Sequence, residues 1–248
     1  MIAPVHPALV RLALRQCLAR RRWMILVILA ALPVVLAFGV RVSTGADDPV
    51  RLVTQVLSTL IVTGVVPVVG LLLANAALGS EVDDGTLVYL LTKPLPRWQI
   101  VTSKLFTAAL LAVAVTAGTT LVSSLIALGG SDPSHLAAGF ATGVAVGAVL
   151  YTAVFLALSL ITRRGMLVGL IYLIVWEGAF SGFFAGTRTF SIRQYILSIA
   201  DAITTVDPDE FTALLPFGTA WPMAIAVALG ALLLSVSRLR RFELDKTG

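Results

Sequence analysis

Hydrophobic residues recur in long, nearly unbroken runs along the chain, and polar residues gather between the runs. A bilayer needs about 20 apolar helical residues to be crossed, and six runs are long enough. They cover residues 23–40, 52–78, 105–128, 136–161, 165–184 and 212–237. The strict alternation of apolar and polar positions that marks a transmembrane β-strand is missing from them. The pattern therefore predicts an all-α polytopic membrane protein with six transmembrane helices.

Composition supports a membrane location. Hydrophobic residues make up 58% of the 248 residues and charged residues 12%, against about 45–50% and about 25% in soluble domains. Such a chain has too little polar surface to cover a soluble globule, and it lacks the charge of a disordered one. Cys17 is the single cysteine, so an intrachain disulfide is excluded.

The basic residues predict the orientation. Fourteen of the 18 lysines and arginines fall in the N-terminus, in 81–104, in 163–164 and in the C-terminal tail, which an even number of spans places on one side. Because lysine and arginine prefer the cytoplasmic side, we expect both termini there, in the cytoplasmic (inner or plasma) membrane of a bacterium. The net charge of +5 then reflects orientation, and nucleic-acid binding is not expected. The expected divisions are a cytoplasmic N-terminus (1–22), one six-helix transmembrane domain (23–237) and a cytoplasmic tail (238–248).

Residues 7–22 predict an amphipathic helix ahead of the first span. The apolar residues near one face are Leu9, Leu12, Ala13 and Leu18, and the basic residues near another are Arg11, Arg15 and Arg22. Such a helix can lie flat in the headgroup region. An anchor that only fixes the topology is the alternative interpretation.

The segment between the second and third runs predicts a short capped helix. Ser80, with Asp83 three residues later, forms a capping-box-like start, and acidic residues in a first turn suit the helix dipole. The apolar stripe of this helix consists of Leu87, Leu90 and Leu91. Pro94 and Pro96 end it, and residues 97–104 form a second short amphipathic piece before the third span. An interfacial loop helix without a special role is the alternative.

The same segment resembles the pattern of ABC-2-type transporter permeases. That pattern is roughly E-x3-G-T-L-x2-L-L-S/T-x-P-x2-R, followed by a lysine that enters the third span. The matching residues are Glu81, Gly85, Thr86, Leu87, Leu90, Leu91, Thr92, Pro94, Arg97 and Lys104. The six spans, the cytoplasmic termini and the N-terminal helix fit the same family, so the resemblance covers most of the chain.

The resemblance implies a function. The chain would be the permease subunit of a two-component ABC exporter with type V exporter-like architecture, and residues 80–93 would be the coupling helix that docks on a separate ATP-binding subunit. The residues expected to take part in coupling are Glu81, Asp83, Asp84, Gly85, Thr86, Leu87, Leu90, Leu91 and Arg97. Two copies of the chain, or one copy in a heterodimer, would pair around a central route with two ATP-binding subunits. The expected cargo is hydrophobic or amphipathic.

ATP chemistry is expected on the partner. The phosphate-loop pattern G-x4-G-K-S/T is missing from the sequence, so we expect no enzyme activity and no cofactor in this chain, with ATP and Mg²⁺ on the ATP-binding subunit. His6, His135 and Cys17 are scattered, so no metal site is expected. Within the family, transmitting mechanical work for the maturation of a copper enzyme is the alternative to export. A non-transporting scaffold is a further hypothesis.

Glu177 is the clearest ionisable residue inside a predicted span. It lies about 20 Å beyond Arg164 along a helix that rises 1.5 Å per residue, in the outer half of the fifth span. An intramembrane carboxylate is costly and is by default a functional hypothesis. Structural hydrogen bonding and lining of the transport route carry equal weight, and an intramembrane enzyme that uses Glu177 as acid or base is a hypothesis of a different class.

The segment after the fifth run predicts a short helix on the outer membrane surface. The apolar residues at helical spacing are Ile192, Tyr195, Ile196, Ile199 and Ile203. The polar residues away from that face are Arg193, Gln194, Ser198 and Asp201. The resemblance implies a helix that dips back and caps the outer end of the route, and a surface-resting loop helix is the alternative.

Glycines recur every four residues in the fourth and fifth predicted spans. They are Gly139, Gly143 and Gly147 in the fourth, with Gly165, Gly169, Gly178, Gly182 and Gly186 in and after the fifth. Small residues at this spacing let helices approach closely. Packing within the chain is expected, and a subunit interface is the alternative.

Overall fold

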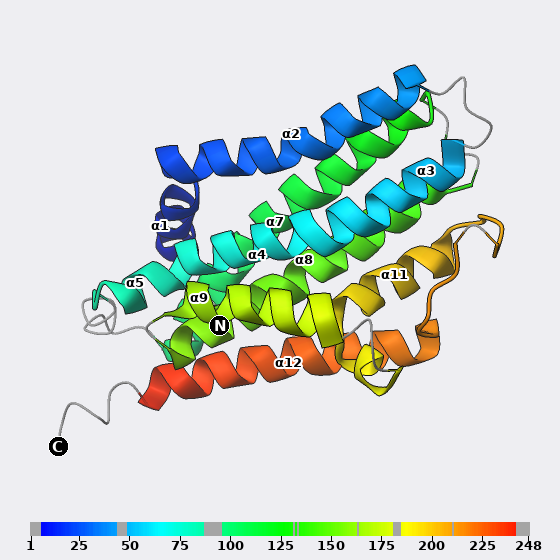
Figure 1. Ribbon diagram of the computed structural model, residues 1–248. Helices are drawn as coiled ribbons and strands as arrows, with labels where there is room; N and C mark the ends of the chain where they lie inside the picture. Colours follow the sequence, from blue (N-terminus) through cyan, green and yellow to red (C-terminus); the bar gives the residue numbers. More distant parts are fainter. Residues whose placement is uncertain are drawn as a thin grey trace.

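The computed structural model describes residues 6–43, 49–86, 96–130, 132, 134–162, 164–180, 185–209 and 211–241. Within these ranges every regular element is a helix, and the long helices run side by side in one bundle (Figure 1). The first helix lies across one end of the bundle, which we call the α1 end. The opposite end, where α2 (Arg20–Ser43) ends and α3 (Pro49–Val56) begins, is called the α3 end.

The elements are as follows. The first part contains α1 (Pro7–Cys17), α2 (Arg20–Ser43), α3 (Pro49–Val56), η1 (Leu57–Val65), α4 (Val66–Ala74), η2 (Asn75–Gly79) and α5 (Ser80–Asp83). The second part contains α7 (Arg97–Ala127), α8 (Leu136–Ile161), α9 (Gly165–Ile171), η3 (Tyr172–Phe180), η4 (Ala185–Phe190), α11 (Ile192–Ile203) and α12 (Phe217–Arg241). The elements η1, η2 and η3 are π-helical, and η4 is a 3₁₀-helix.

Five stretches of the described chain are long and apolar enough to cross a membrane. They are Arg21–Val42, Val50–Asp83, Arg97–Ala127, Leu136–Ile161 and Phe217–Leu239. They correspond to the first four predicted spans and the sixth. In the place of the fifth lies a shorter apolar helix, Gly165–Gly178, which continues to Phe180, and residues 181–184 lie outside the described ranges. Helix length therefore supports five spans, and the helix in the place of the predicted fifth span is shorter than these five.

The stretch from α3 to α5, called span two below, is helical throughout, so the expected helix start at Ser80 is wrong. Gly79 and Ser80 both have right-handed helical backbone angles. The Ser80 hydroxyl donates to the Ala76 carbonyl one turn earlier, at 3.4 Å, instead of capping a new helix. The helix ends at Asp83, and Gly85, two residues later, has a left-handed φ of +69° that suits glycine. Glu81 and Asp83 therefore lie in the last turn of the second span instead of opening a separate helix.

Residues 97–104 are likewise part of a longer element. Pro96 is extended, and α7 runs without a break from Arg97 to Ala127. Proline fits ahead of a helix because it has no N–H to donate. The short piece expected before the third span is therefore the first two turns of α7.

The short helix predicted after the fifth run is present as α11, but it is buried in the bundle, so the expectation that it rests on a surface is wrong. Ile192 and the residues from Gln194 to Ala200 are all buried, and α11 contacts α8 and α12. Figure 1 shows it continuing toward the α3 end beyond the point where η3 stops. Together, α9–η3 and α11 therefore cover the depth that one long helix was expected to cover.

The glycines of α8 explain why α11 fits there. A Cβ on Gly139 would lie 2.8 Å from the Ala200 carbonyl oxygen, and one on Gly143 or Gly147 would overlap Ile196. Real Cβ atoms do not approach so closely, so the backbones of α8 and α11 touch only because these positions lack a side chain. Within this chain the three glycines thus face α11.

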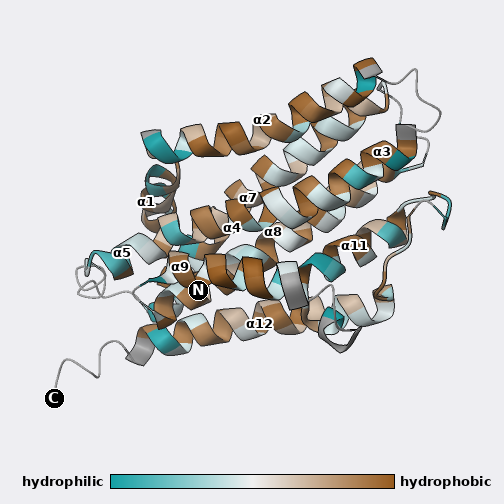
Figure 2. Cartoon of the chain, in the orientation of Figure 1, coloured by the Kyte–Doolittle hydropathy of each residue, from teal (hydrophilic) through white to brown (hydrophobic). Residues whose placement is uncertain are grey.

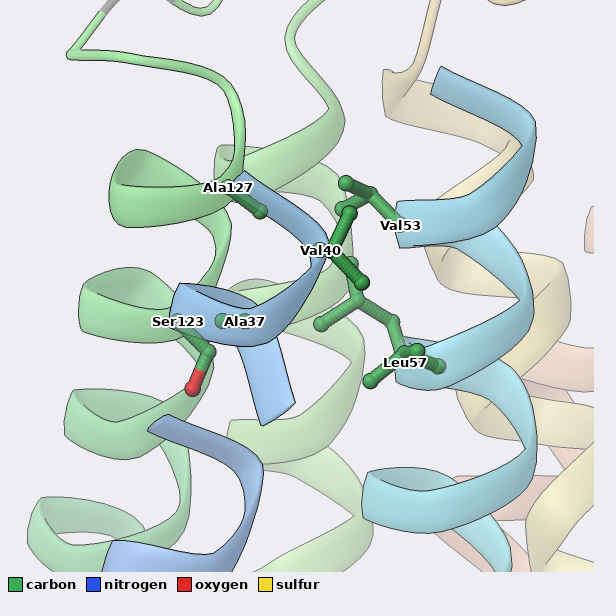
Figure 3. Close-up of a pocket in the computed structure, with 7 residues that line it drawn as sticks. Ala37, Val40, Val53, Leu57, Ser123 and Ala127 are labelled. Atoms are coloured by element: carbon green, nitrogen blue, oxygen red, sulfur yellow. The ribbon is translucent and has the colours of Figure 1, made fainter. Parts of the chain in front are cut away.

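At the α3 end, aliphatic side chains seal α2, α3 and α7 together. Figure 3 shows Ala37 and Val40 meeting Val53 and Leu57 beside Ser123 and Ala127. They leave a cavity of about 10 Å³, and the Ser123 hydroxyl already donates to the Thr119 carbonyl at 2.7 Å. The face of span two that carries Val53 and Leu57 is therefore closely packed and buried.

Replacing Gly143 by alanine is expected to destabilise the protein. Alanine normally favours a helix over glycine by about 1 kcal/mol, but here the added methyl meets the Ile196 carbonyl, and overpacking costs about 1–3 kcal/mol. Gly118→Ala is the matched control, because a Cβ there meets nothing within 4 Å. We expect thermal unfolding in detergent to show a lower Tm for Gly143→Ala and an equal or higher one for Gly118→Ala. Equal Tm values for the two variants would contradict the packing of α11 on α8.

Candidate functional site: the junction of span two, α7 and α1

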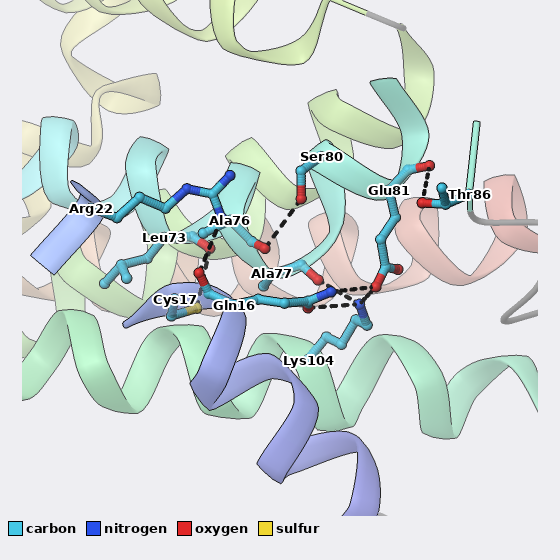
Figure 4. Close-up of polar contacts among 10 residues, drawn as sticks. All are labelled: Gln16, Cys17, Arg22, Leu73, Ala76, Ala77, Ser80, Glu81, Thr86 and Lys104. Carbon is cyan, nitrogen blue, oxygen red and sulfur yellow. Dashed lines mark hydrogen bonds and ion pairs between the residues drawn. The ribbon is translucent and has the colours of Figure 1, made fainter. Parts of the chain in front are cut away.

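A buried ion pair joins the end of span two to α7. Lys104 is fully buried, and its Nζ lies 2.5 Å from Glu81 Oε1. The same ammonium donates to the Ala77 carbonyl at 2.6 Å and to Gln16 Oε1 at 3.4 Å (Figure 4). A lysine ammonium has three N–H groups, so each of them has an acceptor here.

Gln16 brings α1 into the same network. Its Nε2 donates to Glu81 Oε1 at 2.8 Å, so its amide contacts both members of the ion pair. Arg22 at the start of α2 donates from Nη1 to the Gln16 carbonyl at 3.1 Å. Three segments far apart in sequence therefore meet at one point, which we call the Lys104 junction (Gln16, Ala77, Glu81 and Lys104).

Helix α1 is held against the bundle by one face. Leu9, Ala13 and Cys17, four residues apart, are buried, and the Cys17 thiol points at the Leu73 carbonyl with a sulfur–oxygen distance of 3.9 Å. Leu12 and Leu18, expected on the apolar face, are exposed instead. Gln16 lies seven residues after Leu9 and so on the same buried face. A polar residue on the apolar side of α1 was the signal in the sequence that could have revealed this contact.

Because the Lys104 junction is buried, separating its ion pair costs free energy. An unpaired charge in a protein interior costs several kcal/mol, and removing one partner of a buried pair typically destabilises by about 3–5 kcal/mol. Glu81 is 9% exposed, so some of that penalty is relieved by solvent at this site. Glu81 faces α7 and α1 inside the junction, and its position depends on both.

The remaining residues expected to take part in coupling follow Glu81 at the surface. Asp83, Asp84, Gly85 and Thr86 are exposed, and the Thr86 hydroxyl donates to the Glu81 carbonyl at 3.5 Å. Leu87, Leu90 and Leu91, with the apolar stripe expected there, lie outside the described residues. Arg97 is the first residue of α7 and is partly buried. The described part of the segment is thus an acidic helix end fixed to the Lys104 junction.

Glu177 serves the N-terminus of α11. Its carboxylate is 3% exposed, and it accepts from the Ser191 hydroxyl at 2.6 Å and from the Ile192 N–H at 3.0 Å. The Tyr172 hydroxyl donates to it at 3.4 Å. The N-terminus of a helix attracts a negative charge because its first N–H groups are unpaired. Of the two roles considered for Glu177, this geometry favours structural hydrogen bonding.

Gly178 and Gly182 were expected to let helices pack closely, and no metal site was expected. Gly178 is exposed, and its nearest neighbour within 4 Å is the Leu173 carbonyl of its own helix, while Gly182 lies outside the described residues. In the described part of the chain, no group of three or more histidine, cysteine, aspartate or glutamate residues could hold a metal ion.

The fold and the comparisons together define the protein. The bundle of long apolar helices is that of a multi-pass helical membrane protein. Residues 13–236 match the pattern of the ABC-2 family transporter proteins, and the chain belongs to that family. Membership indicates the permease of an ABC transporter that works with an ABC ATP-binding subunit. No curated protein matches the chain in sequence.

Cys17 offers a probe of the Lys104 junction. Burial raises the pKa of the Cys17 thiol to about 11, and only the thiolate reacts with maleimides. We therefore expect slow alkylation at pH 8. Lys104→Met removes a charge that lowers the thiol pKa, but the unpaired Glu81 loosens α1 and relieves the larger effect of burial, so we expect the rate to rise about tenfold. The readout is mass spectrometry after timed exposure to N-ethylmaleimide.

Two controls accompany that measurement. Arg238→Met removes a cation from α12, away from the Lys104 junction, and should leave the rate unchanged. Glu81→Met combined with Lys104→Met replaces the pair by apolar residues, which is often near neutral, and should restore slow alkylation. An unchanged rate in Lys104→Met alone would show that the junction does not hold α1.

The hydrogen-bonding role of Glu177 can be tested by comparing its replacement by alanine with its replacement by glutamine. Glu177→Ala leaves the Ile192 N–H and the Ser191 hydroxyl without an acceptor, which costs about 1–3 kcal/mol. Glu177→Gln keeps one carbonyl oxygen for Ile192 and should lose less. We expect the Tm in detergent to fall in the order wild type, Gln, Ala. Equal losses in both variants would instead indicate that the negative charge itself is required.

Proposed function

We propose that this chain is the permease subunit of an ATP-driven ABC exporter in a bacterial cytoplasmic membrane, with both termini cytoplasmic. A separate ATP-binding subunit docks on residues 80–93, and two such subunits serve a pair of permease copies, taken to be identical. Besides the family, the observation that carries the proposal is the Lys104 junction. It connects residues 83–86, on which the ATP-binding subunit would push, to span two, α7 and α1.

The Lys104 junction suits the transmission of force. A displacement of residues 83–86 acts on the end of span two, one turn from Glu81. Since Glu81 and Lys104 cannot part without leaving buried charges unpaired, α7 follows span two. Gln16 extends the same constraint to α1, so the α1 end of the bundle moves as one body.

The chemistry of ATP belongs to the partner in this proposal. ATP and Mg²⁺ bind to the ATP-binding subunit, and this chain contributes no catalytic residue and binds no cofactor. Its cargo is hydrophobic or amphipathic and leaves the cytoplasm. The hypothesis of an intramembrane enzyme loses support because the Glu177 carboxylate is occupied by the N-terminus of α11.

The test is co-purification of the chain with the ATP-binding subunit encoded beside it, followed by assay of ATP turnover. Glu81→Ala and Gly85→Trp should lose the complex or lower turnover within the roughly 5–150-fold range that coupling energies of about 1–3 kcal/mol produce. Gly85→Asn tolerates the left-handed backbone and should retain more activity than Gly85→Trp.

Asp207→Ala is the control for the loss of an acidic group. Asp207 is exposed and lies between α11 and α12, far along the chain from residues 80–93. Its replacement should leave assembly with the ATP-binding subunit and ATP turnover unchanged. Assembly and turnover that are indifferent to Glu81→Ala and Gly85→Trp would refute docking on residues 80–93.

A further inference from the structure

A groove of about 290 Å³ lies between α8 and α12, and every residue that lines it is apolar. Its walls include Val154, Ala157 and Leu158 of α8 and Val227, Gly230 and Leu234 of α12. It opens at the surface of the chain, because Gly230 and Leu234 are exposed. An apolar cavity of about 150 Å³ stays dry and binds benzene, so this groove has room for part of a hydrocarbon chain.

Small residues of the two helices explain the shape of the groove. Ala153, Ala157 and Ala231 are buried together, so α8 and α12 approach closely there. Gly230 lies beside this contact, and a Cβ added to it would meet nothing within 4 Å. The glycines of α8 are covered by α11, whereas the space at Gly230 is not filled by any atom of the described chain.

The surface of α12 around the groove is suited to lipid. Its large exposed side chains follow one another at four-residue spacing and are Phe217, Trp221, Ile225, Leu229 and Leu233. Figure 2 shows hydrophobic colouring along most of α12 and a hydrophilic segment close to its α1 end. Acyl chains are the neighbours of such a face in a bilayer, since they are as apolar as leucine.

A cation stands just beyond the groove on α12. Arg238 is exposed and follows Leu234 by four residues, so it lies on the same face, about 6 Å farther along the helix. A cation at the end of a span can also serve only to anchor it in the headgroup region. Here the charge continues a groove, and a guanidinium binds phosphate oxygens through two parallel hydrogen bonds.

Helix α8 places the groove close to the headgroup region. Leu158 is three residues from Ile161, the last residue of α8, so the groove reaches to about 5 Å from that end. Arg164, which is exposed and precedes α9, brings a second guanidinium to the same end of the bundle. Basic sites between transmembrane helices of this kind bind anionic lipid headgroups.

We infer that the groove between α8 and α12, together with Arg238, binds one anionic phospholipid of the leaflet at the α1 end. An acyl chain lies in the groove and the phosphate pairs with Arg238, in the order in which a lipid carries these two parts. A lipid without a cation of its own is preferred, because a headgroup cation competes with Arg238 for the phosphate. This site goes beyond the proposed function and does not depend on it.

Lipid titration followed by native mass spectrometry tests the site. The full-length chain in detergent is titrated with phosphatidylglycerol and, separately, with phosphatidylcholine. Gly230→Phe fills the groove, and Arg238→Gln removes the cation. The matched controls are Gly39→Phe on α2, where a Cβ also meets nothing within 4 Å, and Arg21→Gln, which is exposed near the start of α2 at the same end of the bundle.

We expect the wild-type chain to retain one phosphatidylglycerol at least about fivefold more tightly than phosphatidylcholine, and Arg238→Gln to lose that preference, because one basic residue near a membrane surface contributes about this factor. Gly230→Phe should weaken both lipids about fivefold or more, since a displaced chain loses many small dispersion contacts. Both controls should bind as the wild type does. Phosphatidylglycerol should also raise the Tm of the wild type more than that of Gly230→Phe, since a ligand of the folded state stabilises it.

Three results would overturn the inference. Binding by Gly230→Phe equal to that of the wild type, or an equal loss in Gly39→Phe, would show that lipid coats the surface without using the groove. A wild-type dimer that retains no lipid and separates into monomers in Gly230→Phe would show that a second copy fills the groove. Displacement of the lipid by glycerol phosphate, which has no acyl chain, would show that the phosphate is bound without the groove.

Discussion

The charge of Lys104 is the constraint around which the α1 end of the protein is built. A buried ammonium needs an anion and further acceptors, and no single helix of this chain supplies them. Glu81 and Ala77 come from span two, and Gln16 comes from α1. Satisfying one cation thus fixes the relative position of three elements and the start of the acidic segment that follows Glu81.

A buried charge needs partners in the middle of the bundle as well, but there the charge is the Glu177 carboxylate and the partners are hydrogen-bond donors. The first N–H groups of α11 have no acceptor within their own helix, and Ser191 and Ile192 are buried. Glu177 supplies the acceptors, and the glycines of α8 let the short helix approach closely enough to stay there. A carboxylate that looks anomalous in an apolar run is therefore what makes a broken helix tolerable at this depth.

The contrast between these two sites and the α3 half is informative. At Lys104 and at Glu177 the charged groups are paired within the chain, and at the Lys104 junction Glu81 Oε2 is left without a hydrogen-bond partner among the described residues. In the α3 half, Gln55 and Thr59 of span two are exposed, and Gln194 Oε1 and Ser198 Oγ of α11 have no hydrogen-bond partner among the described residues.

The sequence by itself determined the class of protein, because the length of an apolar run is a local property that membrane thickness converts directly into a span. It also pointed to the family through the residues from Glu81 to Lys104. The prediction that a helix starts at Ser80 is wrong. Serine followed by acidic residues suits a helix start locally, but in the continuing helix the Ser80 hydroxyl donates to the Ala76 carbonyl. Only the tertiary structure decided that Gln16 meets Glu81, that α11 is buried and that Glu177 caps it. Those contacts join residues that no local period relates, and they follow from which buried polar group can find a partner once the helices have packed.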